Sequence, residues 1–371
     1  MTLTVESVRD PSQLAEFIAL PARLYAGMPG YVAPLERERR EILDPGRSPF
    51  FSHGVAHYWI ARRDGRAVGR VSAQIDHLAD AGAPGYFGCL DCIDDEAAVT
   101  ELMRSAEAWL RERNCSVSQG PYMLSINGES GILVDGHGEP PMVMMPWHPP
   151  YLDRHIKSAG YAACKELYSL VLDPLAPSER LRKLSVDRSR PEFVVRGLRM
   201  NDLNAEARIG QLLFNDAWRD NWGFVPVAEM DVRTAIREFR MFLVPESGVF
   251  LEYRGKPVAF GLALPNLFDI TADLGPSPSP LGWLKFAWRA WRQPYRSWRV
   301  ALFGVSSELR NTVLGGRIAI TIFDVLIRNA FARGARVLEA GWILEDNQIV
   351  QSLTTLGFKR ARTYRLYQRA L

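Results

Sequence analysis

The sequence predicts an α/β protein with a mixed sheet, built from two copies of one structural unit. The first observation is length, because 371 residues suit about two domains of ordinary size. The second is composition, since 47% hydrophobic and 23% charged residues are typical of chains with a packed core. The third is an order of elements, hairpin, helix, strand, helix and strand, that occurs twice at a nearly constant offset. We therefore expect two pseudo-repeats.

Each half contains the same elements in the same order. The first half predicts a hairpin at 57–76, a helix at 94–114, a strand at 115–122, and a helix and strand at 151–172. The second half predicts a hairpin at 248–265, a helix at 315–335, a strand at 335–343, and a helix and strand at 349–371. In both halves a glycine followed by an aromatic residue, Gly160-Tyr161 and Gly357-Phe358, separates the last helix from the last strand.

The boundary between the halves is expected in a segment rich in proline and charge. This gives an N-terminal domain at 1–175, a linker at 176–195 and a C-terminal domain at 196–371. The second half also contains a Trp- and Arg-rich stretch at 274–299 that has no counterpart in the first. We interpret it as an insertion into the fold.

Charge and cysteine content exclude several classes of protein. The net charge is +3, but the segment 283–299 contributes five cations and no acid, so the remainder is slightly acidic and we expect no nucleic-acid partner. The N-terminus lacks the pattern of a secretory signal and no apolar run is long enough to span a bilayer, which predicts a cytoplasmic protein. Cys89 and Cys92 form a C-x-x-C, but Cys115 and Cys164 lack the spacing of the second pair that a zinc site needs, so we expect no metal site.

The order of elements resembles the GNAT acyltransferase fold, and the C-terminal half carries the resemblance residue by residue in "RVALFGVSSELRNTVLGGRIA" and "EDNQIVQSLTTLGF". In that family a splayed strand binds the pantetheine of acyl-CoA, and a glycine-rich turn at a helix start receives the pyrophosphate. The resemblance implies acyl-CoA as co-substrate, held by Phe303, Val305, Arg310, Gly315, Gly316, Arg317 and Asn347.

Physical chemistry supports this turn independently, because free amides and the helix dipole at a helix start favour an anion. The glycines stand further from Arg310 than in the usual motif, so a plain strand-to-helix turn is the alternative. The equivalent segment of the first half, 82–95, ends in acids that would repel a pyrophosphate. We expect that half to bind no cofactor.

Over nearly its full length the chain resembles a bacterial group of GNAT-like proteins with "PFF.H" at Pro49 to His53, "YFG", "NGESGILVDG" and "PPY". This tandem group includes bacterial ceramide synthases. The resemblance implies transfer of a long-chain acyl group to the amine of a sphingoid-like lipid. A non-catalytic lipid- or CoA-binding protein and an acetyltransferase of a small soluble amine are the alternatives.

Candidate catalytic residues lie in a polar, glycine-rich segment at 125–141, where Glu129 is the candidate base. Asn127, Asp135 and His148 are candidates to orient the amine or relay its proton, and an acidic solvated turn is the alternative. The tyrosine that many GNAT enzymes use as general acid is replaced by Leu353, so Tyr364 is a candidate substitute, with packing as the alternative. These assignments predict an active site between the halves.

Two aromatic segments suggest walls of an acyl pocket, with core filling as the alternative. Trp218 and Trp222 stand beside polar residues in 214–226, and Tyr151 ends a methionine-rich run that begins at Pro141.

The segment 282–299 places aromatic and cationic residues in two adjacent stripes at helical spacing, which is typical of a helix lying on anionic lipid. The predicted membrane contacts are Trp283, Trp288, Trp291, Trp298, Arg289 and Arg292. Pro294 is expected to kink the helix. We therefore expect peripheral attachment to the inner face of the cell membrane, and docking on the protein's own surface is the alternative.

Overall fold

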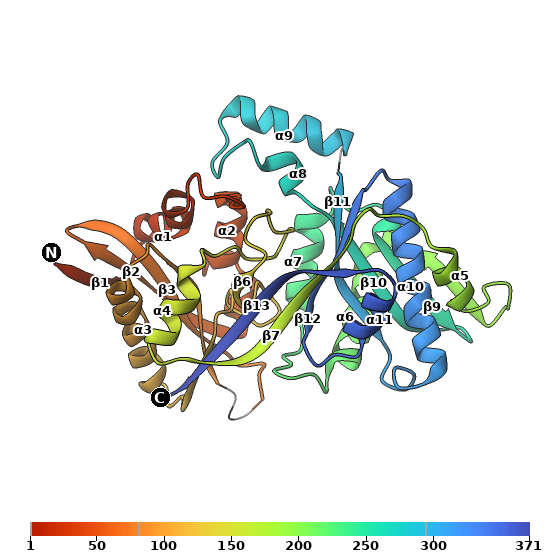
Figure 1. The fold of residues 1–371 in the computed structure, drawn as a ribbon, viewed down its shortest axis with the longest axis horizontal. Coiled ribbons are helices and arrows are strands. Elements are labelled where there is room, and N and C mark those ends of the chain that lie inside the picture. Colours follow the sequence, from red (N-terminus) through yellow and green to blue (C-terminus); the bar gives the residue numbers. More distant parts are fainter. Residues whose placement is uncertain (1, 81, 83, 294) are drawn as a thin grey trace. The chain divides into compact units, whose positions relative to one another are not determined.

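The computed structural model describes residues 2–80, 82, 84–293 and 295–371 (Figure 1). Contacts divide the chain into two compact units. Unit 1 comprises Met1–Tyr168, Thr271–Gly282 and Ala361–Leu371, and unit 2 comprises Ser169–Ile270 and Trp283–Arg360. The chain therefore enters each unit more than once.

Unit 1 is a sheet with helices. Its strands are β1 (Leu3–Ser7), β2 (Gly54–Arg63), β3 (Arg66–Asp76), β4 (Gly85–Cys92), β5 (Val117–Gly120), β6 (Ile132–Asp135), the first part of β7 (Ala162–Leu172) and most of β13 (Lys359–Ala370). Its helices are α1 (Pro11–Leu24), α2 (Glu36–Leu43), η1 (Pro49–Ser52), α3 (Glu96–Arg111) and α4 (Tyr151–Ser158). The strand order is β1-β2-β3-β4-β5-β13-β7. The β4–β5 pair is parallel, whereas β1 to β4 pair antiparallel.

The core of unit 1 forms where α3 packs on the sheet. The apolar residues of α3 face Trp59, Val71 and Phe87, as the helical spacing predicts. A second cluster lies under α1, where Phe17 contacts the ring of Tyr58. Helices thus cover both faces of the sheet.

Unit 2 repeats this plan. Its strands are the end of β7, β8 (Phe193–Gly197), β9 (Gly248–Tyr253), β10 (Lys256–Pro265), β11 (Ser297–Val305) and β12 (Val337–Leu344). Its helices are α5 (Glu179–Leu184), η2 (Met200–Asp202), α6 (Leu203–Trp218), α7 (Glu229–Phe239), η3 (Pro245–Ser247), α8 (Phe268–Thr271), α9 (Pro280–Arg292), α10 (Val313–Ala332) and α11 (Ile349–Thr355). The last residue of α8 and the start of α9, up to Gly282, belong to unit 1. The strand order is β7-β12-β11-β10-β9-β8.

Two glycines allow helices to approach both faces of the unit 2 sheet. A Cβ on Gly261 would lie 2.6 Å from the side chain of Ile322 on α10. A Cβ on Gly304 would lie 3.0 Å from that of Ala217 on α6. The sheet is therefore held between α10 and α6.

The predicted tandem α/β fold is confirmed. Both predicted hairpins form, and both turn through two residues with positive φ, Asp64-Gly65 and Arg254-Gly255, which is the turn that suits the twist of paired strands. In each unit a strand, a helix and a parallel strand follow the hairpin.

The final strand shows an arrangement that the repeat pattern does not reveal. β13 comes from the second half of the sequence, yet it pairs antiparallel with β5 of unit 1, where Tyr367 lies opposite Gly120. The end of β7, written in the first half, belongs to unit 2. Each unit thus takes its last strand from the other half of the chain.

The predicted two-stripe helix at 282–299 is only partly correct. α9 ends at Arg292, and β11 begins at Ser297. Trp298 is buried in β11, and the buried guanidinium of Arg299 donates to the carbonyl of Gly341 at 2.9 Å. β11 lies inside the sheet, between β12 and β10. Because side chains on both faces of such a strand are covered, Trp298 cannot reach a membrane. Pro294 lies outside the described residues.

We predict that Tyr367→Ala destabilises unit 1 selectively. The ring is fully buried in the unit 1 core, and removing it should cost roughly 3–5 kcal/mol. The matched control Gln368→Ala, at an exposed neighbouring position, should change stability by less than about 0.5 kcal/mol. Urea unfolding with hydrogen exchange measures both effects. Faster exchange in β9 and β10, with β4 and β5 unchanged, would contradict this assignment of the last strand.

Candidate functional site

In unit 2 two neighbouring parallel strands stop pairing before either ends. The β11–β12 ladder runs from Ser297↔Val337 to Val300↔Ala340. β11 continues to Val305 and β12 to Leu344 without further pairs. Backbone groups beyond the last pair must find other partners, since buried peptide groups are almost always hydrogen-bonded. We call the region between the two strands beyond Val300 and Ala340, where their backbone groups no longer pair with each other, the slot.

A β-bulge lies at the point where the strands part. On the other side of β11 the register passes from Leu262↔Leu302 to Ala263↔Val300, so Ala301 has no counterpart in β10. A bulge bends its strand and re-aims the extra residue, and bulges are frequent beside active sites. Ala301 was not among the residues predicted from sequence, because a bulge has no local sequence signal here.

The slot leads into the start of α10. Thr312 caps this helix, and its hydroxyl accepts from the N–H of Gly315 at 3.0 Å. The N–H groups of Val313 and Leu314 have no hydrogen-bond partner among the described residues. Two free amides at the positive end of a 20-residue helix can bind an anion.

The two glycines of this turn have different roles. A Cβ on Gly315 would lie 1.9 Å from the carbonyl oxygen of Leu309, so glycine is required there by the fold. A Cβ on Gly316 would meet nothing within 4 Å. Only Gly316 leaves open space beside the helix start.

The side chains of Asp216, Ser307 and Arg310 hold the turn between β11 and α10 against the end of α6. Asp216 accepts from the N–H and the hydroxyl of Ser307 at 2.7 and 2.8 Å. Burial raises its pKa, but the hydrogen bonds from Ser307 lower it more, so the pKa lies below the ordinary value. Arg310 donates to the carbonyl of Ala217 at 2.7 Å and contacts Asp220. Arg310 is therefore held by α6, which corrects the prediction that it is free for a pyrophosphate.

Trp218 lies against the slot. Its indole N–H donates to the carbonyl of Phe303 at 2.9 Å, so this backbone acceptor of β11 is already occupied. Its ring stacks on Phe214 and meets Trp342 of β12 edge-on, with centroids 5.1 and 5.9 Å apart. The predicted substrate residue Trp218 thus stands in an aromatic group beside the parted strands, and Trp222 follows it in the next turn, half-buried.

The remaining predicted cofactor residues are placed as follows. Arg317 donates to the carbonyl of Ser185 at 2.7 Å, and Val305 is buried at the end of β11. The side chain of Asn347 accepts from the N–H of Ile349, the first residue of α11, at 3.1 Å. Leu353, at the position of the usual tyrosine acid, is buried in α11.

In unit 1 the corresponding strands also part, but the gap is filled by the chain. β4 and β5 pair only at Gly85↔Ser118 and Tyr86↔Gln119. The N–H of Tyr122 then donates to the carbonyl of Phe87 at 2.9 Å. A Cβ on Gly88 would lie 1.7 Å from the carbonyl oxygen of Tyr122, so the two segments are in direct contact. No comparable slot remains at this place.

The predicted base lies in a buried charged cluster of unit 1. Glu129 forms an ion pair with Arg39 at 2.6 Å, with side chains 10% and 8% exposed. Arg70 pairs with Asp91 at 2.8 Å in the same region. Removing one partner of such a pair leaves a costly buried charge. Glu129 would have to leave Arg39 before it could accept a proton.

The structure brings His148 into this cluster. Burial lowers its pKa, and this outweighs Asp91 and Glu129, which favour the charged form. Its Nδ1 accepts from the N–H of Leu133 at 3.3 Å, as a neutral imidazole can. His148 is therefore a neutral, structural acceptor in this arrangement.

The other predicted residues of unit 1 are not gathered around Glu129. Asn127 and Asp135 are exposed, and Asp135 ends β6. Tyr364 is fully buried on β13. Tyr151 begins α4 and donates to the carbonyl of Cys92 at 2.8 Å, which gives it a structural role.

Within the described residues, no group of three or more His, Cys, Asp or Glu side chains could hold a metal ion. Burial raises the pKa of the Cys89 and Cys92 thiols, so neither is a ready nucleophile. In the part of the chain that the structure covers, no helix is both long and apolar enough to cross a membrane.

Comparisons with known proteins agree with this geometry. No family model matches the chain. It is 35% identical over 375 aligned positions to a bacterial ceramide synthase of Caulobacter vibrioides, covering 100% of this chain and 98% of that protein. It is 36% identical to protein YghO of Escherichia coli, covering 99% and 95%.

Solved structures show the same fold at low identity. A tandem GNAT protein from the clavulanic acid biosynthesis pathway matches with a TM-score of 0.58 and 13% identity, covering 100% of this chain and 98% of that one. A GCN5-related N-acetyltransferase from Sphaerobacter thermophilus matches with a TM-score of 0.51 and 12% identity, covering 99% and 95%.

The fold is that of tandem GNAT proteins. The chain belongs to the family that contains the bacterial ceramide synthase of Caulobacter vibrioides.

We predict that His148 makes stability depend on pH. Because burial lowers its pKa, the unfolded chain takes up a proton below about pH 6.5 that the folded protein refuses. The free energy of unfolding should therefore fall as the pH falls from 7 to 5. His148→Asn keeps an acceptor for the N–H of Leu133 but does not titrate, so its stability should fall less over this range. Urea titrations at each pH measure the difference, and parallel curves would contradict the assignment.

Proposed function

We propose that the protein transfers an acyl group from acyl-CoA to the amine of a sphingoid-like lipid, as a ceramide synthase does. The observation that carries this proposal is the parted β11–β12 pair, bulged at Ala301 and leading to the open helix start at Gly316. An extended polar chain that ends in a diphosphate matches a slot edged by backbone groups and closed by free helix amides. The pantetheine and diphosphate of coenzyme A have this form.

The residues of unit 2 then have separable roles. Backbone groups of 301–305 that Trp218 leaves unoccupied bind the pantetheine, and the amides of Val313 and Leu314 bind the diphosphate. The amine attacks the thioester carbonyl, a C–N bond forms, the C–S bond breaks, and the amine proton is lost as the thiolate is protonated. In this proposal a backbone N–H at the bulge stabilises the oxyanion.

Several observations support one acyl donor per chain and a lipid acceptor. The corresponding gap of unit 1 is filled by the Tyr122 segment, and the start of α3 bears Asp94, Asp95 and Glu96. The aromatic group of Trp218, Phe214 and Trp342 offers an apolar wall to an acyl chain. The relative named ceramide synthase covers the whole chain.

The outer face of α9 supports attachment to an anionic membrane surface. Leu281, Leu284, Trp288 and Trp291 are 57–78% exposed and recur at helical spacing. The opposite side of the helix is held to the protein, because the ring of Phe286 contacts that of Phe242 and Arg289 donates to the carbonyl of Ile270 at 2.9 Å. Arg289 is therefore not the free membrane contact that the sequence predicted. The exposed cations Lys285 and Arg292, on a helix without acids, complement anionic lipid at about 1 kcal/mol each.

The transfer itself is tested with purified protein, acyl-CoAs of graded chain length and a long-chain amino alcohol, by following free thiol and amide product. We expect thiol release that depends on the amine and rises with acyl length. Gly316→Ala should leave the fold intact, because its Cβ meets nothing, but should weaken CoA binding about tenfold by blocking the diphosphate. Gly138→Ala, also in open space, is the control. If no thiol is released at any acyl length, the proposed transfer is wrong and the alternative of a non-catalytic binding protein remains.

Attachment to lipid is tested by sedimentation with vesicles containing anionic phospholipid. Trp288→Ser with Trp291→Ser should reduce binding at least about tenfold, because two exposed rings no longer enter the interface. Leu212→Ser, on the exposed face of α6, should not. Unchanged vesicle binding together with loss of a dimer in the tryptophan variant would assign this face to a second copy of the chain.

A further inference from the structure

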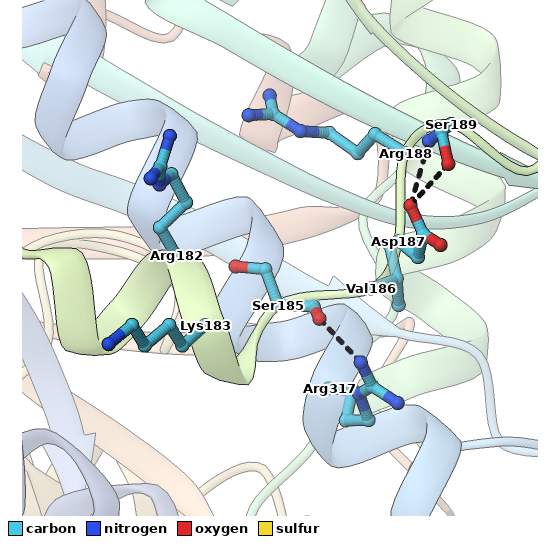
Figure 2. A pocket seen from close by; sticks show the side chains of 8 residues that line it. All are labelled: Arg182, Lys183, Ser185, Val186, Asp187, Arg188, Ser189 and Arg317. Atoms are coloured by element: carbon cyan, nitrogen blue, oxygen red, sulfur yellow. Dashed lines mark hydrogen bonds between the residues drawn. The ribbon is translucent and has the colours of Figure 1, made fainter.

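A cavity of about 420 Å³ lies in unit 2 beside α10. It is lined by Arg182, Lys183, Ser185, Val186, Asp187, Arg188, Ser189 and Arg317 (Figure 2). All but one of these residues come from α5 and the segment after it, which joins the two repeats. The exception, Arg317, belongs to α10. The cavity is thus formed between the connecting segment and a helix of the fold.

The connecting segment is fixed on α10 by two hydrogen bonds. Arg317 donates to the carbonyl of Ser185 at 2.7 Å, as Figure 2 shows. The N–H of Val186 donates to the hydroxyl of Thr321 at 2.9 Å. Ser178 caps α5, because its side chain accepts from the N–H of Leu181. The wall of the cavity is therefore a defined structure.

The cavity has an excess of positive charge that the protein does not neutralise. Four of its lining residues are cations and one, Asp187, is an acid. Its carboxylate accepts from the hydroxyl and N–H of Ser189 at 2.6 and 3.1 Å, and these bonds hold its pKa below the ordinary value. Among the described residues Lys183 and Arg188 have no hydrogen-bond or ion-pair partner, while Arg182 has only an exposed pair with Glu179.

Cations gathered around one cavity repel one another, and an anion relieves that repulsion. Guanidinium groups match the oxygens of a phosphate. A volume of about 420 Å³ exceeds that of a bare phosphate and falls in the range of pockets for small organic ligands. These features fit a phosphate monoester attached to a larger group.

The position of the cavity indicates which phosphate monoester. Arg317 follows Gly316 directly, so the cavity adjoins the helix start assigned above to the diphosphate. We propose that this pocket binds the 3′-phosphorylated nucleoside at the far end of coenzyme A. This inference rests on the proposed function. It makes the segment between the repeats part of the acyl-donor site and a determinant of the preference for CoA over dephospho-CoA.

Calorimetric titration of the full-length protein with CoA and with dephospho-CoA tests the inference, because the two ligands differ only in the 3′-phosphate. The wild-type protein should bind CoA about tenfold more tightly. Lys183→Gln with Arg188→Gln should reduce this ratio below about threefold and leave dephospho-CoA affinity nearly unchanged. Arg208→Gln, an exposed cation on α6 outside the pocket, should keep the wild-type ratio.

The outcomes separate this inference from the proposed function. Equal affinity of the wild-type protein for both ligands overturns the pocket assignment but leaves the acyl-CoA slot in place. Binding of neither ligand overturns both. If the double variant keeps its preference for CoA but loses binding to vesicles containing phosphatidic acid, the phosphate belongs to a lipid headgroup and the coenzyme assignment is wrong.

Discussion

The parting of β11 from β12 is the constraint on which the rest of unit 2 depends. Once two parallel strands separate, their peptide groups need other partners, because an unpaired buried group costs about as much as a lost hydrogen bond. Trp218 satisfies one of them at Phe303, and Asp216 and Arg310 hold the turn that follows. The groups that remain face a slot that an extended, polar molecule can enter. The position of α6 is thus linked to the shape of the donor site.

Parallel strands part in both units, but the backbone groups at the gap find different partners. In unit 1 the chain itself crosses the gap at Tyr122 and brings Glu129 to Arg39. Those buried ion pairs favour a single arrangement but occupy the groups that chemistry would need. Unit 2 leaves its gap open and adds a connecting segment whose cations surround a cavity. The two halves thus differ at the place where their parallel strands part.

Predictions from the sequence were correct where neighbouring residues determine the structure, and wrong where residues distant in the chain determine it. Asp64-Gly65 and Arg254-Gly255 identify hairpins because few residues adopt the left-handed conformation of such turns. The helical spacing beyond Arg292 predicted a longer helix wrongly, because the same spacing continues into the buried strand β11. Glu129 appeared to be a free acid because its partner, Arg39, lies far away in the chain.

The sequence by itself determined the tandem α/β fold, the helix that contains Gly315 and Gly316, and the aromatic and cationic pattern of α9, since each follows from neighbouring residues and their spacing. Only the tertiary structure decided that β13 joins unit 1, that Ala301 is bulged and that Lys183 and Arg188 share a cavity with Arg317. These features depend on strand pairing and on contacts between segments that are distant in the chain. The spacing of neighbouring residues in the sequence does not reveal such contacts.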